Sequence, residues 1–347
     1  MFKRDDRPTA AVGAPARVPY ALTGGLVGGA VVAVLAGTIL TAEEAVPGIP
    51  LPGPVVAYGL PVVRVLLDVA ALAVVGLSLL PKLIGFDSPE TSEPVLRRVR
   101  PATVSMAWAW ALLALVTVVF QAAELTPGVF PTPASVAGYV SEVGAGQGLV
   151  ISAACALTCA GVGLLAVRFG EAVPAELRVV VALFGLLPIP VTGHAVNSVW
   201  HDPIMISMEL HVIGAAAWTG GLLITVVYLA ARPGLLAIVL PRFSRLATIC
   251  LVLVGVSGLV SGLSTMALTP GVELPGALLT SGYGLLVVTK TALLALLLPL
   301  AARIRFVLLP HVARGRAAGV AAWAGAELTV MGLAYGVAVV LTRAAIG

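Results

Sequence analysis

The sequence predicts an all-α integral membrane protein, a polytopic bundle of about nine transmembrane helices. The chain has 347 residues, of which 59% are hydrophobic and only 10% are Asp, Glu, Lys or Arg. Its mean hydropathy is +1.08. A soluble domain carries about 25% charged residues, so a surface this poor in charge requires lipid as its solvent. Long apolar runs separated by short polar loops complete the pattern of a multi-pass protein.

Nine stretches are long enough to cross a bilayer as helices. About 20 apolar residues span about 30 Å of hydrocarbon, and a helix satisfies its own backbone hydrogen bonds there. The stretches are continuous, whereas the strands of a membrane barrel alternate in polarity. Glycine pairs such as Gly25/Gly29 and Gly258/Gly262 mark expected helix contacts. The predicted spans are 20–42, 59–80, 101–124, 145–168, 177–199, 203–230, 244–267, 282–302 and 318–342.

The basic residues of the loops predict the orientation of the chain. Lys and Arg cluster before the first span and in alternate loops, and the intervening loops 43–58, 125–143, 200–202 and 268–281 contain none. Arg343, at the extreme end, is the exception. By the positive-inside rule, the N-terminus lies in the cytoplasm and the C-terminus outside a bacterial-type plasma membrane. The formal net charge of +4 therefore indicates topology, and nucleic-acid binding is not expected.

A group of candidate metal ligands surrounds the predicted outer turn before the sixth span. Asp202 followed by Pro203 is a strong helix start, so the group lies in that turn and in the first turns of the helix. Thioether and imidazole groups together suit Cu(I) better than Cu(II). Alternatively, the methionines only fill gaps between helices. The candidates are His194, His201, Met205, Met208 and His211.

Ionisable residues inside the predicted spans form a second candidate set. Arg64 and Asp68 are four residues apart and can pair along one helix. Lys290 and Glu327 lie near mid-depth in the last two spans, where they can meet as an ion pair. Such residues are costly in lipid, so they serve either as structural pairs or as a proton or cation relay. Glu209 lies four residues after Met205 and joins the candidates for a transport path.

The sequence contains no motif of an energy-coupled pump or of a known enzyme class. There is no P-loop, no Gly-x-Ser-x-Gly nucleophile elbow and no CxxCH haem attachment site. The prediction is therefore a membrane protein that is not an enzyme.

Motifs in the second half resemble those of the bacterial copper resistance protein D family. The run His211-x6-Trp218-x-Gly220-Gly221-Leu222 resembles the family's H-x6-W-x-G-G-L element, and its Trp218, Gly220 and Gly221 are expected to pack helices. The resemblance covers about residues 190–342 and extends to residues 1–190 only in general layout. Further runs follow in the family's order: RFSRLA at 242–247, VSGL at 256–259, SGYGLLVVTK at 281–290 and Glu327-Leu328.

The resemblance implies a copper-handling protein of the inner membrane, and it singles out His211, Trp218, Lys290 and Glu327. Together with the polar composition of the first residues, it suggests a division of the chain into three parts. Residues 1–18 form a disordered cytoplasmic tail, and residues 19–190 form N-terminal membrane helices with about four and a half spans. Residues 191–347 form a membrane domain like copper resistance protein D.

Copper transport across the plasma membrane is the leading hypothesis. Histidines and methionines would capture copper at the outer face and pass it through the bundle toward Lys290 and Glu327. A b-type haem or quinone redox protein is an alternative, for which His194 and His211 are the candidate axial ligands. A third hypothesis is an assembly partner that delivers copper to an oxidase. The partners considered are the lipid bilayer, the copper ion, an extracellular or periplasmic copper chaperone and an oxidase assembly protein.

Overall fold

The structure, a computed structural model, describes residues 17–42, 50–188, 201–314 and 319–344, and these residues form helices without any strand. Eight helices of this described part are long and apolar enough to cross a membrane. They are α1 (Arg17–Leu40), α2 (Pro54–Ile84), α3 (Pro89–Leu125), α5 (Gly144–Phe169), α7 (His201–Leu229), α8 (Pro233–Ala267), α10 (Gly282–Arg303) and α12 (Val320–Leu341). Short helices connect them: α4 (Pro133–Glu142), α6 (Ala175–Phe184), α9 (Ala277–Thr280) and α11 (Leu309–Ala313).

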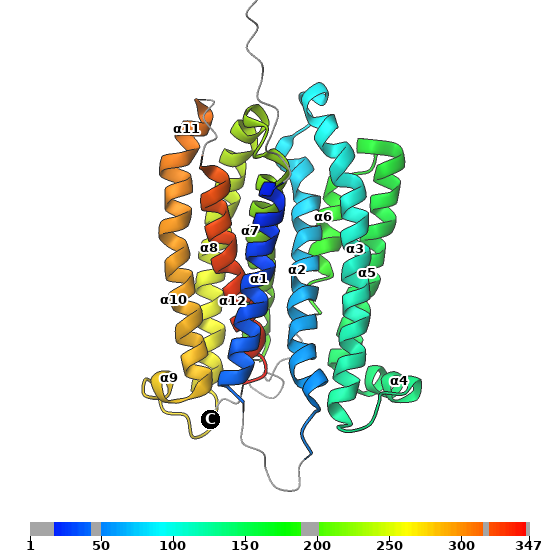
Figure 1. The fold of residues 1–347 in the computed structure, drawn as a ribbon, viewed down its shortest axis with the longest axis vertical. Coiled ribbons are helices and arrows are strands. Elements are labelled where there is room, and N and C mark those ends of the chain that lie inside the picture. Colours follow the sequence, from blue (N-terminus) through cyan, green and yellow to red (C-terminus); the bar gives the residue numbers. More distant parts are fainter. Residues whose placement is uncertain (1–16, 43–49, 189–200, 315–318, 345–347) are drawn as a thin grey trace, which may run out of the picture.

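The polytopic all-α bundle is confirmed, and eight of the nine predicted spans correspond to long helices. The predicted span 177–199 contains only α6 among the described residues, and its residues 189–199 lie outside them. The described residues of this stretch, up to Pro188, run antiparallel to α5. Glu176 lies beside Lys82 of α2 at one end, and Pro188 lies beside Gly148 of α5 at the other. α5 and α7 run in the same direction through the bundle (Figure 1). The chain therefore returns to the side on which α5 begins before α7 starts.

Several helices extend beyond the apolar stretches that predicted them. α3 begins at Pro89 although its apolar part was expected from about residue 101, and α8 begins at Pro233 although 244 was expected. Proline at the first helical positions has its backbone angle preset and lacks an amide hydrogen that would need a partner. Hydropathy finds only the segment that lipid must solvate, whereas the helix continues into the polar interface.

Many of the basic residues lie at one end of the bundle, here called the basic end, whereas Arg343 pairs with Glu124 away from it. The end of α2 meets the beginnings of α6 and α8 at the basic end, where Lys82 contacts Glu176 and Arg242 binds the carbonyls of Leu83 and Ile84. α1 begins at this end, and α12 finishes at the opposite end (Figure 1). The described termini therefore lie on opposite sides of the bundle.

Glycines let two pairs of helices approach closely in the centre of the bundle. A Cβ on Gly332 of α12 would lie 2.2 Å from the carbonyl oxygen of Leu26 in α1. A Cβ on Gly220 of α7 would lie 2.0 Å from the carbonyl oxygen of Leu72 in α2. Such backbone contacts are the main means of packing helices in lipid, where no hydrophobic effect drives them together.

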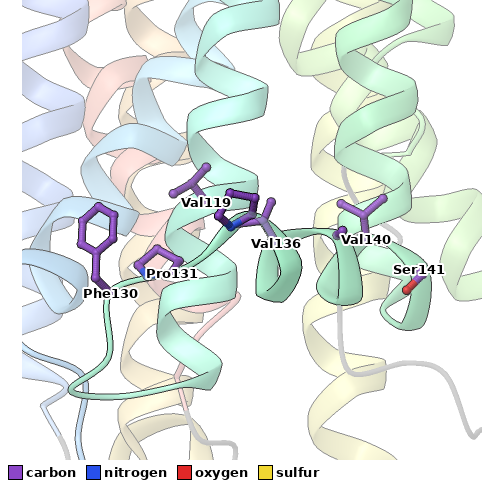
Figure 2. Close-up of a pocket in the computed structure, with 8 residues that line it drawn as sticks. Val119, Phe130, Pro131, Val136, Val140 and Ser141 are labelled. Atoms are coloured by element: carbon purple, nitrogen blue, oxygen red, sulfur yellow. The ribbon is translucent and has the colours of Figure 1, made fainter.

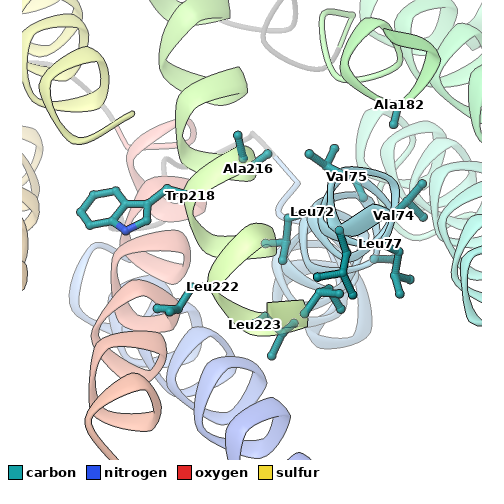
Figure 3. Packing of buried hydrophobic residues seen from close by; sticks show 14 of the residues in the cluster. Leu72, Val74, Val75, Leu77, Ala182, Ala216, Trp218, Leu222 and Leu223 are labelled. Atoms are coloured by element: carbon teal, nitrogen blue, oxygen red, sulfur yellow. The ribbon is translucent and has the colours of Figure 1, made fainter. Parts of the chain in front are cut away.

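The core lies around α2 and α7, which with α12 are the most buried spans, whereas α8 and α10 are the most exposed. In Figure 3, Leu72, Val75 and Leu77 of α2 lie between α7 and Ala182 of α6. Gly221 faces the ring of Phe243, and a Cβ there would approach that ring to 2.7 Å. The packing role predicted for the two glycines of the WTGG run thus agrees with their surroundings.

The close contact of α2 with α7 predicts a stability difference between two glycine substitutions. Gly220→Ala should lower the free energy of unfolding by about 1–3 kcal/mol, because the added methyl would overlap the backbone of α2. Gly28→Ala is the matched control, since no heavy atom lies within 4 Å of a Cβ there. Thermal unfolding of the purified variants in detergent measures both effects. Equal losses in the two variants would contradict the assigned packing.

Candidate functional site

His211 is a buried histidine on α7, in the interior of the bundle. Its side chain is 9% exposed and lies against α8. Its Nδ1 atom is 3.1 Å from the carbonyl oxygen of Val254 and 3.2 Å from the hydroxyl oxygen of Ser257. The imidazole is therefore held by polar atoms within an apolar bundle.

Trp218 and Glu327 form a buried hydrogen bond between α7 and α12. The indole Nε1 of Trp218 donates to Oε1 of Glu327 over 3.1 Å, and both side chains are almost fully buried. Figure 3 shows the Trp218 ring on the side of α7 away from α2. Trp218 follows His211 by seven residues, so the two lie on nearly the same face of α7, about 10 Å apart along its axis. This face of α7 thus carries an imidazole and, through Trp218, a carboxyl group.

The predicted ion pair between Lys290 and Glu327 is not formed. The polar partner of Glu327 among the described residues is Trp218, and no salt bridge joins its carboxyl group to Lys290. The physical reason is the arrangement of the helices: Glu327 faces α7, whereas half-buried Lys290 belongs to α10, the most lipid-exposed span.

Arg64 and Asp68 do pair along α2, as their spacing predicted. The guanidinium Nε of Arg64 lies 3.6 Å from Oδ1 of Asp68, and both side chains are largely buried. The pair lies within the membrane-spanning part of α2, where each charge offsets the cost of burying the other. Whether it also lines a transport path stays a prediction.

The predicted histidine and methionine ligand series is described only in part. Met205, Met208 and Glu209 are half-buried in the first turns of α7. α7 begins at His201, close to the predicted start, but the His201 side chain and all of His194 lie outside the described residues. In the part of the chain that the structure describes, no three His, Cys, Asp or Glu side chains come together as a metal site. The series therefore stays a prediction.

The sequence did not indicate that hydroxyl groups of α7 and α8 lie near His211. Ser207 of α7 donates to the carbonyl oxygen of Ser257 over 3.2 Å, and Ser261 donates to the Ser207 hydroxyl over 3.4 Å. Serines in membrane helices commonly bond to their own backbone, so they carry little signal alone. The available signal was the spacing of Ser257 and Ser261, which places both on one face of α8.

The sequence also did not indicate an ionic network at the basic end. Arg100 is 5% exposed and donates to both carboxylate oxygens of Glu93, at 2.7 and 2.8 Å, and to Glu171 at 2.8 Å. At the edge of this network, the hydrogen bond from Lys82 holds the pKa of the exposed Glu176 carboxyl below its usual value. These contacts join α3 to the turn after α5, and α2 to α6, so we interpret the network as structural.

A broad, open hollow lies between α3 and α4 (Figure 2). Its lining is almost entirely apolar and contains none of the predicted site residues. It includes Val119, Phe130, Pro131, Val136, Val140 and Ser141. It offers no group suited to binding a metal, and the candidate site remains the polar interior around α7.

Two family models match this chain. Residues 55–199 match the model described as copper resistance protein D-like, N-terminal domain, and residues 237–341 match the model described as copper resistance protein D. No curated protein and no solved structure matches. The second match contains Lys290 and Glu327, whereas His211 and Trp218 lie between the two matches. The first match extends the likeness into the half of the chain for which the motifs gave only a general layout.

The Trp218–Glu327 hydrogen bond predicts that substitutions of its two residues have non-additive effects on the stability of the protein. Trp218→Phe should destabilise the protein by about 1–3 kcal/mol, because the buried carboxyl group loses its donor. Adding Glu327→Met should recover part of that loss, since no buried polar group is then left unpaired. Thermal unfolding of the single and double variants measures the coupling. Trp108→Phe, at a lipid-exposed indole, is the control, and strictly additive losses would contradict the contact.

Proposed function

Because the chain belongs to the copper resistance protein D family, we propose that it transports copper across the membrane that its helices span. Membership makes it a membrane protein of copper resistance and homeostasis. The proposal adds that copper is the transported substrate and that it passes through the helix bundle along α7.

The observation that carries this proposal is the buried imidazole of His211. A polar side chain inside a membrane bundle is costly and is usually retained for function. His211 belongs to one of the most buried spans, and the carboxyl group of Glu327 lies about two helical turns along the same helix face. An imidazole can bind a copper ion, and a carboxyl group can supply negative charge for a cation.

The first turns of α7 supply the proposed approach to His211. Met208 precedes His211 by three residues and lies on the same side of the helix, and Met205 lies one turn earlier. Thioethers select soft Cu(I) over Cu(II), so we propose Cu(I) as the transported form. His194 and His201 complete the proposed capture site at the mouth, before copper passes to the methionines.

The positive charge of Lys290 is proposed to control the movement of copper along this path. A cation on the proposed path would also meet the positive charge of Lys290, because the described partner of Glu327 is Trp218 and no salt bridge to Glu327 neutralises that charge. Like charges repel strongly where water is scarce. We propose that Lys290 limits how long a copper ion stays at His211, whereas Glu327 favours its onward movement.

The distribution of charge supports an orientation for transport. The basic end of the bundle corresponds to the cytoplasmic side under the positive-inside rule. The beginning of α7 then opens to the outside of a bacterial-type plasma membrane, where a copper chaperone or an oxidase assembly protein could supply or receive copper. We accordingly propose uptake from that side.

The redox alternative lacks a supporting observation. A b-type haem needs two opposed imidazoles at similar depth. Among histidines whose side chains the structure describes, the other one is His311, which belongs to α11 and binds the carbonyl oxygen of Val307. His194, the other candidate axial ligand, lies outside the described residues, so the haem alternative stays a prediction beside the proposed copper transport.

Copper binding tests the proposed ligands. We expect wild-type protein to bind Cu(I) tightly in anaerobic competition with a chelator. A variant with Met205→Leu, Met208→Leu and His211→Ala should bind at least about 100-fold more weakly, because it loses three soft or borderline ligands. A control variant with Met106→Leu and His311→Ala changes the same residue types elsewhere. Equal binding by all three proteins would contradict the ligand assignment.

Transport itself is tested in liposomes that contain only this protein. Copper should accumulate inside them faster than in protein-free liposomes, and the His211→Ala variant should lose most of the difference. A non-transporting delivery protein would bind copper yet give no flux. Absence of flux from correctly folded wild-type protein would therefore contradict transport and favour the role of an assembly partner.

A further inference from the structure

We propose that Val254, Ser257 and Gly258 of α8 fix the His211 imidazole in a single tautomer, with the proton on Nδ1 and Nε2 as its only free ring nitrogen. These three residues are positioning residues for His211. The consequence for copper rests on the proposed function, but the tautomer itself can be measured without any metal.

Both groups that face Nδ1 are hydrogen-bond acceptors. The carbonyl oxygen of Val254, 3.1 Å away, has no hydrogen to donate. The hydroxyl group of Ser257, 3.2 Å from Nδ1, donates its own hydrogen to the carbonyl oxygen of Leu253. Its oxygen is therefore left to accept. Since neither neighbour can donate, Nδ1 must carry the proton of the neutral ring.

The other ring nitrogen, Nε2, has no hydrogen bond to any residue that the structure describes. With the proton on Nδ1, Nε2 presents a lone pair within a side chain that is only 9% exposed. A histidine that binds a metal characteristically donates its second ring N–H to a backbone carbonyl, which sets the tautomer and orients the ring. The contact of His211 Nδ1 with the carbonyl oxygen of Val254 has this arrangement.

Gly258 provides the space that the ring needs. A Cβ at this position would lie 2.9 Å from Cε1 and 3.2 Å from Nδ1 of His211. Cε1 lies between the two nitrogens, so any side chain at 258 would press the imidazole away from its acceptors. Two other glycines of α8 differ: a Cβ on Gly255 or Gly262 would make ordinary contacts, at 3.6 and 3.5 Å.

The crossing of α7 and α8 maintains this geometry. Ser207 of α7 donates to the backbone carbonyl of Ser257, one turn from His211. Ser261, one turn further along α8, donates to the Ser207 hydroxyl. These bonds hold the two helices in the register that places Val254 opposite Nδ1.

Nitrogen-15 NMR of histidine-labelled, full-length protein in lipid tests the tautomer. The His211 signals are assigned by their loss in the His211→Gln variant. We expect one protonated Nδ1 and one unprotonated Nε2 in the wild type and in Gly255→Ala, and a mixture of tautomers in Gly258→Ala. A wild-type ring protonated on Nε2, or a Gly258→Ala spectrum identical to wild type, would overturn the proposal. The wild-type spectrum decides the tautomer even if Gly258→Ala does not fold.

Copper titration of the same variants separates this inference from the proposed function. Gly258→Ala should bind Cu(I) about tenfold more weakly than wild type, because loss of the groups that orient a ligand typically weakens metal binding by this amount. Gly255→Ala should bind Cu(I) as tightly as wild type does. If wild-type protein shows the expected tautomer but binds no copper, the proposed function fails and the positioning stands. If it binds copper but Gly258→Ala binds equally well, the positioning role is overturned and the proposed function stands.

Discussion

Hydrocarbon offers no hydrogen-bond partner, and this constraint acts on the polar side chains that the bundle buries. Most of those described have a partner, although the hydroxyl oxygens of Ser78 and Thr225 have none among the described residues. Hydroxyl groups such as those of Thr248 and Thr291 meet the constraint by donating to the carbonyl four residues earlier in their own helix. His211 and Glu327 cannot do so and take partners from neighbouring helices. The side chains that cross between helices are therefore those whose presence calls for a functional explanation.

Close helix packing brings these groups to the centre. Gly220 and Gly221 allow α7 to lie directly against α2 and Phe243. That contact turns the adjacent Trp218 toward α12, where it meets Glu327, and the seven-residue spacing places His211 on nearly the same face. One short run of sequence thus sets both the packing of the most buried span and the position of its polar groups. The copper path proposed above depends on this arrangement.

The fold could be predicted from the sequence far better than the contacts of the site. Hydropathy located eight of the nine predicted spans because lipid determines composition over the part of each helix that crosses it. The i,i+4 spacing of Arg64 and Asp68 was sufficient to predict their pair. The pairing of Lys290 with Glu327 could not be judged in this way, since it depends on which neighbour each helix faces. Likewise, the acceptors of His211 are 43 and 46 residues away along the chain. Only the crossing of α7 with α8 reveals them.

X-ray absorption spectroscopy of the Cu(I)-loaded protein tests the central claim, that copper is bound in the interior by the His211 imidazole together with thioether sulfur. The account predicts a first shell of nitrogen and sulfur in the wild type, with the imidazole contribution lost in His211→Ala and retained in His311→Ala. A shell without imidazole nitrogen, or one that is unchanged in His211→Ala, would contradict it.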